Sequence, residues 1–403
     1  MVNPKRMLAE FLELTRIPSP SRREAAVAEA VTAKLRAIGL RVRRDHCHRA
    51  FGGETGNIIA HLPGSRRGKR SLLLNAHIDT VPQLVLRSED ASVRRSGTSS
   101  SAKAEASPLR RVASVPVPRR AGKYIVSGGD GPFGADDKVG VVAILEALRC
   151  VVEDGIEHPA LDIVFTVGEE SGLLGAKGLD ARELRAAIGF TFDSDGRAGR
   201  VVNRAPSQDS FTATITGRAA HAGVAPEKGV NAIRIAARAI AGMRMGRVDR
   251  ETTANIGIIE GGVATNIVPD RVRVEGEARS HSDRKLERQL DHMLKRLHDA
   301  AAEGGGGIEI EVRPQYRSFH LAKENPALQV AAAAVRSIGR RMKLETTGGG
   351  SDANIFNAHG VPTAIIGCGY DNPHSARERM EVAEFEPLGR LAVALIRVAA
   401  AAP

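Results

Sequence analysis

Short apolar runs alternate with helix-like segments along most of the chain. Residues 24–38 place apolar side chains at helical spacing, and the run at 71–75 is apolar on both faces, as expected of a central parallel strand. Further strands are predicted at 57–62, 161–167, 188–192 and 363–367. Further helices are predicted at 138–152, 180–187, 327–338 and 384–400. This alternation predicts an α/β fold with a mostly parallel central sheet and helices on both faces.

The pattern changes near residue 206. Residues 210–216 alternate between apolar and polar positions, as a half-exposed strand does. A helix at 230–243, strands at 254–260 and 271–279, a charged helix at 283–302 and a strand at 308–313 follow. This β-α-β-β-α-β order is that of a ferredoxin-like module. Because α/β character resumes after about residue 319, we expect a discontinuous main domain, 1–205 and 319–403, interrupted by an inserted domain at 206–318.

One segment, residues 84–120, fits neither pattern. It is rich in Ser, Arg, Ala and Pro and has no period. This composition predicts a flexible, solvated loop, with a basic ligand-contacting flap as the alternative.

Composition and charge exclude several classes of protein. The 403-residue chain is 42% hydrophobic and 26% charged, as soluble globular proteins are. Its net charge of +11 accompanies only 3% aromatic residues and no Trp, so stacking surfaces for bases are scarce and nucleic-acid binding is not expected. No apolar run approaches the ~20 residues that span a bilayer, and the N-terminal segment lacks the apolar core of a signal peptide. We therefore expect a cytoplasmic protein with no membrane partner.

Two adjacent carboxylates, Glu169 and Glu170, follow the apolar run at 161–167. Side chains within a strand point to opposite faces, but beyond its end both can converge on one site. One carboxylate could then bind a cation while the other moves a proton.

Other metal-binding residue types lie just after predicted strands or before a helix: His77, Asp136, Asp193 and, far downstream, His374. In open α/β sheets, sites form beyond the carboxyl ends of the strands, so we expect these side chains to converge. Imidazole and carboxylate without thiolate suit Zn²⁺, with Co²⁺ or Mn²⁺ as alternatives. Two histidines and three carboxylates exceed one catalytic zinc and suit two metals that share a carboxylate. Asp195 is an alternative to Asp193, although its neighbour Gly196 favours a turn-capping role.

Seven motifs in one order extend this pattern over nearly the whole chain. They are His77-x-Asp79, Gly134-Ala135-Asp136-Asp137-Lys138, Glu169-Glu170-Ser171-Gly172, Asp193-Ser194-Asp195-Gly196, Ala220-His221-Ala222-Gly223, Thr265-Asn266-Ile267-Val268-Pro269-Asp270 and Gly349-Gly350-Ser351-Asp352-Ala353-Asn354. In combination they resemble the M20 family of co-catalytic metallopeptidases, especially its tripeptide aminopeptidase, or peptidase T-like, branch.

The resemblance implies two zinc ions per subunit and a role for each ligand. His77 and Asp193 would hold one ion, Glu170 and His374 the other, and Asp136 would bridge both. The resemblance also implies a cis peptide between Asp136 and Asp137.

Two further carboxylates take part in the implied chemistry. Asp79 would orient the imidazole of His77, and Glu169 would act as general base and acid. Lys138 would neutralise the acidic cluster or would simply be solvated.

The inserted domain and the glycine-rich motif supply the implied substrate contacts. His221 would reach across a dimer interface and stabilise the oxyanion, and Asn266 would be placed similarly. Arg279 would grip a substrate carboxylate. Gly349, Gly350 and Ser351 would line the pocket. The inserted domain would thus be a lid and would form a homodimer.

The resemblance predicts a hydrolase that cleaves amide bonds of short peptides, in particular an aminopeptidase acting on tripeptides with a free N-terminus. The alternatives are an N-acyl amino-acid hydrolase or a carboxypeptidase-like enzyme of the same family, and a non-catalytic peptide-binding protein. Family members usually have a short connection between the segments of His77 and Asp136, whereas 83–122 is long here. This departure leaves the substrate preference open.

Overall fold

The computed structural model describes residues 1–65, 71–81, 117–129 and 131–401. The predicted loop at 84–120 therefore falls mostly outside the described residues. Its last residues, predicted to be loop, belong to a strand, β4 (Pro118–Ala121), because they pair with β5 (Tyr124–Ser127). The chain divides into a larger unit, 1–202, 322–345 and 351–403, and a smaller unit, 203–321 and 346–350.

The main sheet has nine strands within the described residues, in the order β1-β2-β6-β3-β7-β16-β8-β14, with β15 paired to β8. The strands are β1 (Val42–Arg44), β2 (Ile58–Leu62), β3 (Leu72–His77), β6 (Leu161–Thr166), β7 (Ile188–Ser194), β8 (Arg200–Ala205), β14 (Phe319–His320), β15 (Lys343–Thr346) and β16 (Thr363–Gly367). The central strands β6, β3, β7 and β16 are parallel, whereas β1, β2, β8 and β14 pair antiparallel with their neighbours. The parallel centre places several strand ends at one edge of the sheet.

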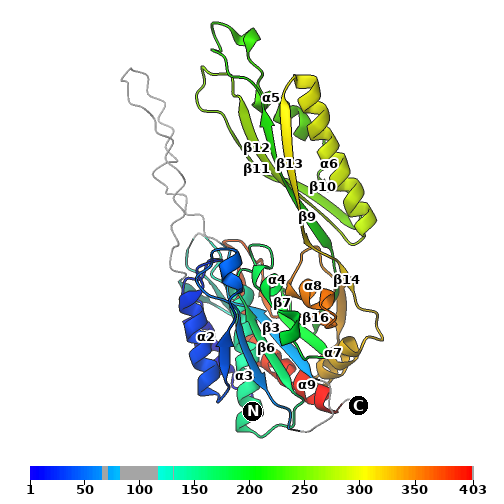
Figure 1. The fold of residues 1–403 in the computed structure, drawn as a ribbon. Helices are drawn as coiled ribbons and strands as arrows, with labels where there is room; N and C mark the ends of the chain where they lie inside the picture. The colour runs from blue at the N-terminus through cyan, green and yellow to red at the C-terminus, as the bar shows by residue number, and fades with distance from the viewer. Residues whose placement is uncertain (66–70, 82–116, 130, 402–403) are drawn as a thin grey trace. The chain divides into compact units, whose positions relative to one another are not determined.

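Helices cover this sheet (Figure 1). They are α1 (Pro4–Leu14), α2 (Ala25–Ala37), α3 (Ala135–Glu153), α4 (Leu174–Gly178), α7 (Pro326–Ser337), α8 (Asp352–Ala358) and α9 (Phe385–Ala401). Leu73 of β3 and Val164 of β6 pack in one buried cluster with Phe356 of α8. Helix α3 is buried along nearly its whole length between the sheet, α1 and α9. The predicted α/β fold is confirmed.

A small second sheet, β17-β18-β5-β4, was not predicted. Its later strands are β17 (Tyr370–Asp371) and β18 (Arg379–Glu381), which pair antiparallel. These strands are too short to give a periodic signal, so only their partners define them. The sheet matters because the segment between β17 and β18 carries His374.

The helices of the structure differ from the predicted ones in two places. The helix expected at 180–187 is wrong: α4 ends at Gly178, and a single 3-10 turn, η3 (Ala181–Glu183), follows before the chain extends. The side chain of Asp180 accepts a hydrogen bond from the Arg182 amide, a local bond that favours a turn over a helix. Helix α1 was missed, although Asn3 caps it and Pro4 occupies its first turn.

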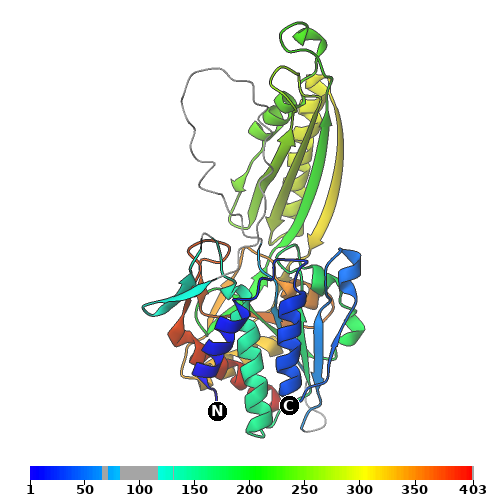
Figure 2. The ribbon, with the colours of Figure 1, turned by 90° about the vertical axis from the view of Figure 1, so that its left-hand side faces the viewer.

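The smaller unit has the predicted ferredoxin-like order (Figure 2). Its sheet, β10-β11-β12-β9-β13, is antiparallel throughout. The strands are β9 (Ser207–Thr216), β10 (Gly246–Arg247), β11 (Thr252–Gly261), β12 (Arg271–Ser280) and β13 (Gly307–Tyr316), and the helices are α5 (Ala232–Ala241) and α6 (Asp283–Gly304). Both helices pack on the sheet over one core: Leu286, Met293 and Leu297 form the buried stripe of α6.

Short 3-10 turns complete the described elements: η1 (Cys47–Ala50), η4 (Pro226–Lys228) and η5 (Val382–Glu384). In the part of the chain that the structure describes, no helix combines the length and apolar character needed to span a bilayer.

Candidate metal centre

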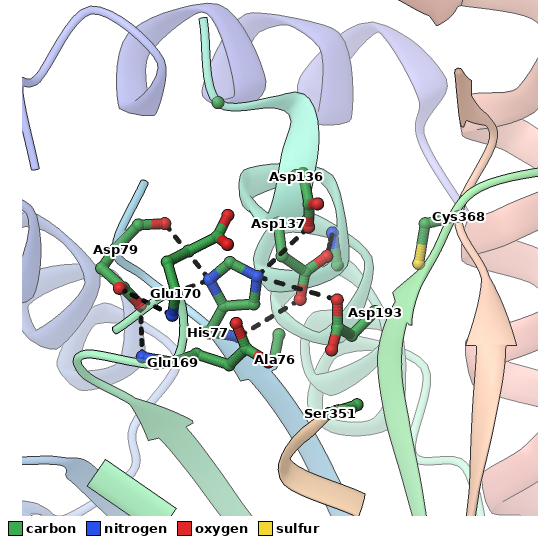
Figure 3. Close-up of polar contacts among 12 residues, drawn as sticks. Ala76, His77, Asp79, Asp136, Asp137, Glu169, Glu170, Asp193, Ser351 and Cys368 are labelled. Carbon is green, nitrogen blue, oxygen red and sulfur yellow. Dashed lines mark hydrogen bonds and ion pairs between the residues drawn. The ribbon is translucent and has the colours of Figure 1, made fainter. Parts of the chain in front are cut away.

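The predicted metal ligands lie together beyond the ends of the parallel strands. His77 is the last residue of β3, Glu170 follows β6, and Asp193 is the penultimate residue of β7. Asp136 lies in the first turn of α3, whose regular helical backbone begins only after Asp137. Figure 3 shows these side chains converging from separate elements.

The carboxylate of Asp136 lies between the two histidines. Its Oδ1 is 3.1 Å from Nε2 of His77, and its Oδ2 is 3.4 Å from Nε2 of His374. His374 Nε2 is also 2.9 Å from Oε2 of Glu170, and His77 Nε2 is 3.7 Å from Oδ1 of Asp193. The structure thus brings all five predicted ligands together, with one carboxylate oriented toward both imidazoles.

Asp193 and Asp195 are clearly separated by their surroundings. Asp193 faces His77, with its Oδ1 3.7 Å from Nε2 of that histidine. Asp195 instead pairs with Arg200, and the following Gly196 has a left-handed φ of 81°. Of these two carboxylates, Asp193 is the one placed for a metal.

The peptide between Asp136 and Asp137 is cis, as the resemblance implied. Asp137 lies near His77 and Asp193, in a group with ligand geometry. However, its Oδ2 accepts a hydrogen bond from the His77 amide and its Oδ1 accepts one from the Gly140 amide. Asp137 therefore caps the start of the regular part of α3 and binds the backbone at the end of β3.

Asp79 connects His77 to the acidic pair. It is fully buried, and its Oδ1 lies 3.4 Å from Nδ1 of His77, whose Nδ1 is also 3.2 Å from the Asp79 carbonyl oxygen. A proton held on Nδ1 by these acceptors leaves the lone pair of Nε2 for a metal. The two Asp79 oxygens also accept hydrogen bonds from the amides of Glu169 (3.0 Å) and Glu170 (3.1 Å), and Ser21 donates to one of them (2.6 Å).

Crowded negative charge dominates the electrostatics of the site. Burial, with a contribution from the Asp193 carboxylate, raises the pKa of Glu169 well above its usual value. Burial likewise raises the pKa of Glu170 and of Asp193. For Asp136 burial acts in the same sense, but hydrogen bonds with His374 and His77 outweigh it and lower the pKa. Hydrogen bonds with Asp136 and Glu170 raise the pKa of His374 to about 10. A bound cation would relieve this repulsion, so the residues fit a divalent metal.

Sequence reasoning missed two buried residues, Tyr370 and Glu378, that support these ligands. The Tyr370 hydroxyl donates to Asp136 Oδ1 (3.1 Å). Glu378 accepts hydrogen bonds from three amides just before and at Asp136. Lys138 is buried rather than solvated: its Nζ donates to Ser19 Oγ and to the Ile78 carbonyl, and burial lowers its pKa to about 8. The proximity of Glu378 to His374 in the sequence was the only available signal.

The glycine-rich motif is divided between the two units. Ser351 caps α8 in a reciprocal bond pattern with Asn354, whereas Gly349 and Gly350 belong to the smaller unit. A side chain at Gly350 would meet the ring of Tyr316 at 2.1 Å, so only glycine fits there. Ser351 belongs to the larger unit, as the metal ligands do, and lies near Asp193 (Figure 3).

Within the smaller unit, His221 and Asn266 lie together. The Ala222 amide donates to the Asn266 carbonyl and the Val268 amide donates to the Ala220 carbonyl, both at 2.9 Å. His221 is exposed, and its Nδ1 accepts a hydrogen bond from the Gly223 amide.

Arg279 lies at the opposite end of the same sheet. Residue 271 of β12 pairs with Thr216, near His221, whereas Arg279 pairs with Gln208. Eight residues of extended strand separate these positions by about 27 Å. The Arg279 guanidinium makes two hydrogen bonds to Glu277, at 2.9 and 3.1 Å. One copy of this unit therefore does not bring Arg279 and His221 together.

Comparisons with known proteins agree with this architecture. A model described as "Peptidase dimerisation domain", of the M20 type, matches residues 206–305, and one described as "Peptidase family M28" matches residues 57–234. The chain is 39% identical over 400 residues to the uncharacterized protein YqjE of Bacillus subtilis, covering 99% of this chain and 100% of that protein.

Two solved structures resemble the chain over its full length. The aminopeptidase PepT from Bacillus cereus is 39% identical, with 99% of each chain covered and a TM-score of 0.80. A tripeptidase from Staphylococcus aureus is 35% identical, with 100% of each chain covered and a TM-score of 0.85. The fold and these similarities define a peptidase. The chain belongs to the M20 family of metallopeptidases, in its peptidase T-like branch.

Proposed function

We propose that this peptidase is a two-metal aminopeptidase that removes the N-terminal residue of short peptides, in particular tripeptides. The observation that carries the proposal is the position of Asp136, whose two carboxylate oxygens lie 3.1 and 3.4 Å from the Nε2 atoms of His77 and His374. A carboxylate shared in this way is the feature that distinguishes a two-metal site from two separate ion pairs.

The donor set suits two zinc ions, with Co²⁺ or Mn²⁺ as alternatives. His77 and Asp193 would hold one ion, Glu170 and His374 the other, and Asp136 both. When bound, such a metal pair polarises the scissile carbonyl and lowers the pKa of the attacking water.

Glu169 is the proton carrier in this proposal. Its side chain is buried and its pKa is raised, which suits a carboxylate that accepts a proton from water and later donates it to the leaving amine. Its amide is held by Asp79, so the carboxylate starts from a fixed backbone position. Asp79 also keeps the proton of His77 on Nδ1.

In this proposal the substrate is bound by residues other than the metal ligands. Arg279 binds the substrate carboxylate by exchanging its partner Glu277 for the peptide. His221 and Asn266 stabilise the oxyanion, and Gly349, Gly350 and Ser351 line the pocket. Because His221 lies at the far end of the sheet from Arg279, one active site would take His221 from a second copy of the chain.

A homodimer through the smaller unit follows from this arrangement. Beyond its short pairing with β10, the outer edge of β11 has no strand partner among the described residues. Ile258 and Ile259 on this stretch are 41% and 51% exposed. Exposed apolar edges of this kind pair readily with another strand. A cytoplasmic setting suits the free, buried cysteines Cys47, Cys150 and Cys368.

The decisive experiment offers one tripeptide, free and N-acetylated, to the Zn²⁺-loaded protein and identifies which residue is released. Release of the N-terminal residue from the free form, without cleavage of the acetylated form, supports an aminopeptidase. Preference for the acetylated peptide would indicate an acylase, and release of the C-terminal residue would indicate a carboxypeptidase. Failure to cleave any form with two metals bound would refute all three.

A further inference from the structure

Glu378 is a buried carboxylate whose contacts all lie next to the metal centre. It follows His374 by four residues, in the segment that leads into β18, and it is only 1% exposed. Neither the ligand set nor the proton transfer described above uses it.

Both oxygens of Glu378 are occupied by backbone donors. Oε2 accepts hydrogen bonds from the amides of Phe133 (2.6 Å) and Gly134 (2.9 Å), and Oε1 accepts one from the amide of Asp136 (3.1 Å). These donors belong to the turn that precedes α3, where Gly134 has a left-handed φ of 84°. Because the turn is buried, loss of the carboxylate would leave up to three amide donors without partners.

The same segment contacts Asp136 at two further points. Tyr370, at its start, donates its hydroxyl to Oδ1 of Asp136, and His374 lies 3.4 Å from Oδ2. The segment 370–381 therefore holds the backbone of Asp136 through Glu378 and its side chain through Tyr370 and His374. This places one metal ligand and the support of another on one stretch of chain.

We propose that Glu378 is a positioning residue for the bridging carboxylate. By accepting the amides of the 133–136 turn, it fixes the backbone of Asp136 relative to His374, so that Asp136 faces both imidazoles before metal binds. Glu378 does not act as a metal ligand or proton carrier, since its oxygens are already bound to N–H groups. The inference rests on the proposed two-metal function, because the position of Asp136 matters only if it bridges two ions.

Two substitutions test this role. Glu378→Gln preserves shape, but its NH₂ group must face at least one amide donor. Glu378→Asp preserves the charge, but it is one methylene too short to reach all three amides. Loss of a residue that orients a metal ligand typically lowers metal affinity by about 10–100-fold. We expect a decrease in that range for Glu378→Gln and a smaller one for Glu378→Asp, with a lower kcat at saturating metal and little change in KM.

Glu146→Gln is the matched control. Glu146 is also fully buried, accepts the Asn3 amide at 2.6 Å, and lies on α3 ten residues beyond Asp136, or about 15 Å along the helix. If Glu378 only stabilises the fold, its variants will lower the Tm as Glu146→Gln does, without changing metal affinity.

The measurements are Zn²⁺ titration against a competing chelator and the visible absorption of the Co²⁺-loaded protein, which reports ligand geometry. Wild-type zinc affinity and cobalt spectrum in Glu378→Asp would overturn the proposal, whether or not Glu378→Gln folds. Absence of two bound metals in the wild-type protein would instead refute the two-metal function itself. The two failures are therefore distinguishable.

Discussion

The two units of the chain differ in how firmly their proposed functional side chains are held in place. In the larger unit the proposed ligands are held by buried acceptors: Asp79 binds the amides of Glu169 and Glu170, and Glu378 binds the turn before Asp136. In the smaller unit His221 is exposed and Arg279 is paired with Glu277. The proposed metal ligands thus meet within one unit, whereas the proposed substrate residues His221 and Arg279 lie far apart in one copy of the other.

Strand direction explains this difference. Parallel strands end at the same edge of a sheet, so β3, β6 and β7 deliver their last residues to one place. The ten-residue antiparallel strands of the smaller unit separate the positions of His221 and Arg279 instead. A parallel sheet therefore brings side chains from distant parts of one chain to one place, whereas the antiparallel sheet of the smaller unit keeps His221 and Arg279 apart.

The largest effects are expected in the larger unit, where substitution of Glu169 and of Glu170 should have different consequences. Glu169→Ala should keep both metals but lower kcat by about 10²–10⁴-fold, because general acid–base catalysis contributes that much. Glu170→Ala should lose metal at the position shared with His374. Metal analysis beside steady-state kinetics distinguishes them, and full metal content in both variants would contradict the ligand assignment.

A second test asks whether the smaller unit acts between copies. His221→Ala should lower kcat by about 10²–10³-fold without loss of metal, as expected for an oxyanion donor. Mixing this variant with Glu169→Ala and allowing subunit exchange should restore activity far above that of either parent, since a mixed dimer has one site with both residues. No recovery in proven mixed dimers would place His221 in its own subunit's site.

A third test addresses how the larger unit holds its ligands. Asp79→Asn should lower metal affinity by about 10–100-fold, because its NH₂ group is a donor and its one oxygen can accept only one of the Glu169 and Glu170 amides. Competitive Zn²⁺ titration measures this change, with Glu146→Gln as the control for a general loss of stability. Unchanged affinity would show that the backbone bonds of Asp79 do not support the ligands.

The smallest expected effect is a pH dependence of the metal-free protein. The pKa of His374 is raised from 6.5 to about 10 by Asp136 and Glu170, so between these values the folded state holds a proton that the unfolded state has lost. Stability should therefore be greatest below pH 6.5 and should fall as the pH rises toward 10. The raised pKa of Glu169 acts in the same direction.

Thermal unfolding with a chelator across this pH range provides the measurement. His374→Ala should reduce the slope, and added Zn²⁺ should reverse it. A Tm independent of pH in the chelated protein would indicate that these charges do not interact as the distances suggest.

Sequence patterns predicted the fold class and located the candidate ligands. His77, Glu170 and Asp193 follow predicted strands, and topology alone implies that such residues meet. The helix expected at 180–187 was wrong, because the side-chain bond of Asp180 to a nearby amide prevailed over a weak apolar period. Glu378 and Tyr370 were missed because neither lies at the end of a periodic element.

By itself the sequence determined which side chains are available for metal chemistry and at which strand ends they lie, because periodicity and motif spacing are local properties. Only the tertiary structure decided how they are held. Contacts from Glu378 to the Asp136 turn, and from Asp79 to the acidic pair, join residues 90 to 245 positions apart. Such contacts depend on how the whole sheet and its helices pack. The spacing of residues along a short stretch of sequence therefore cannot predict them.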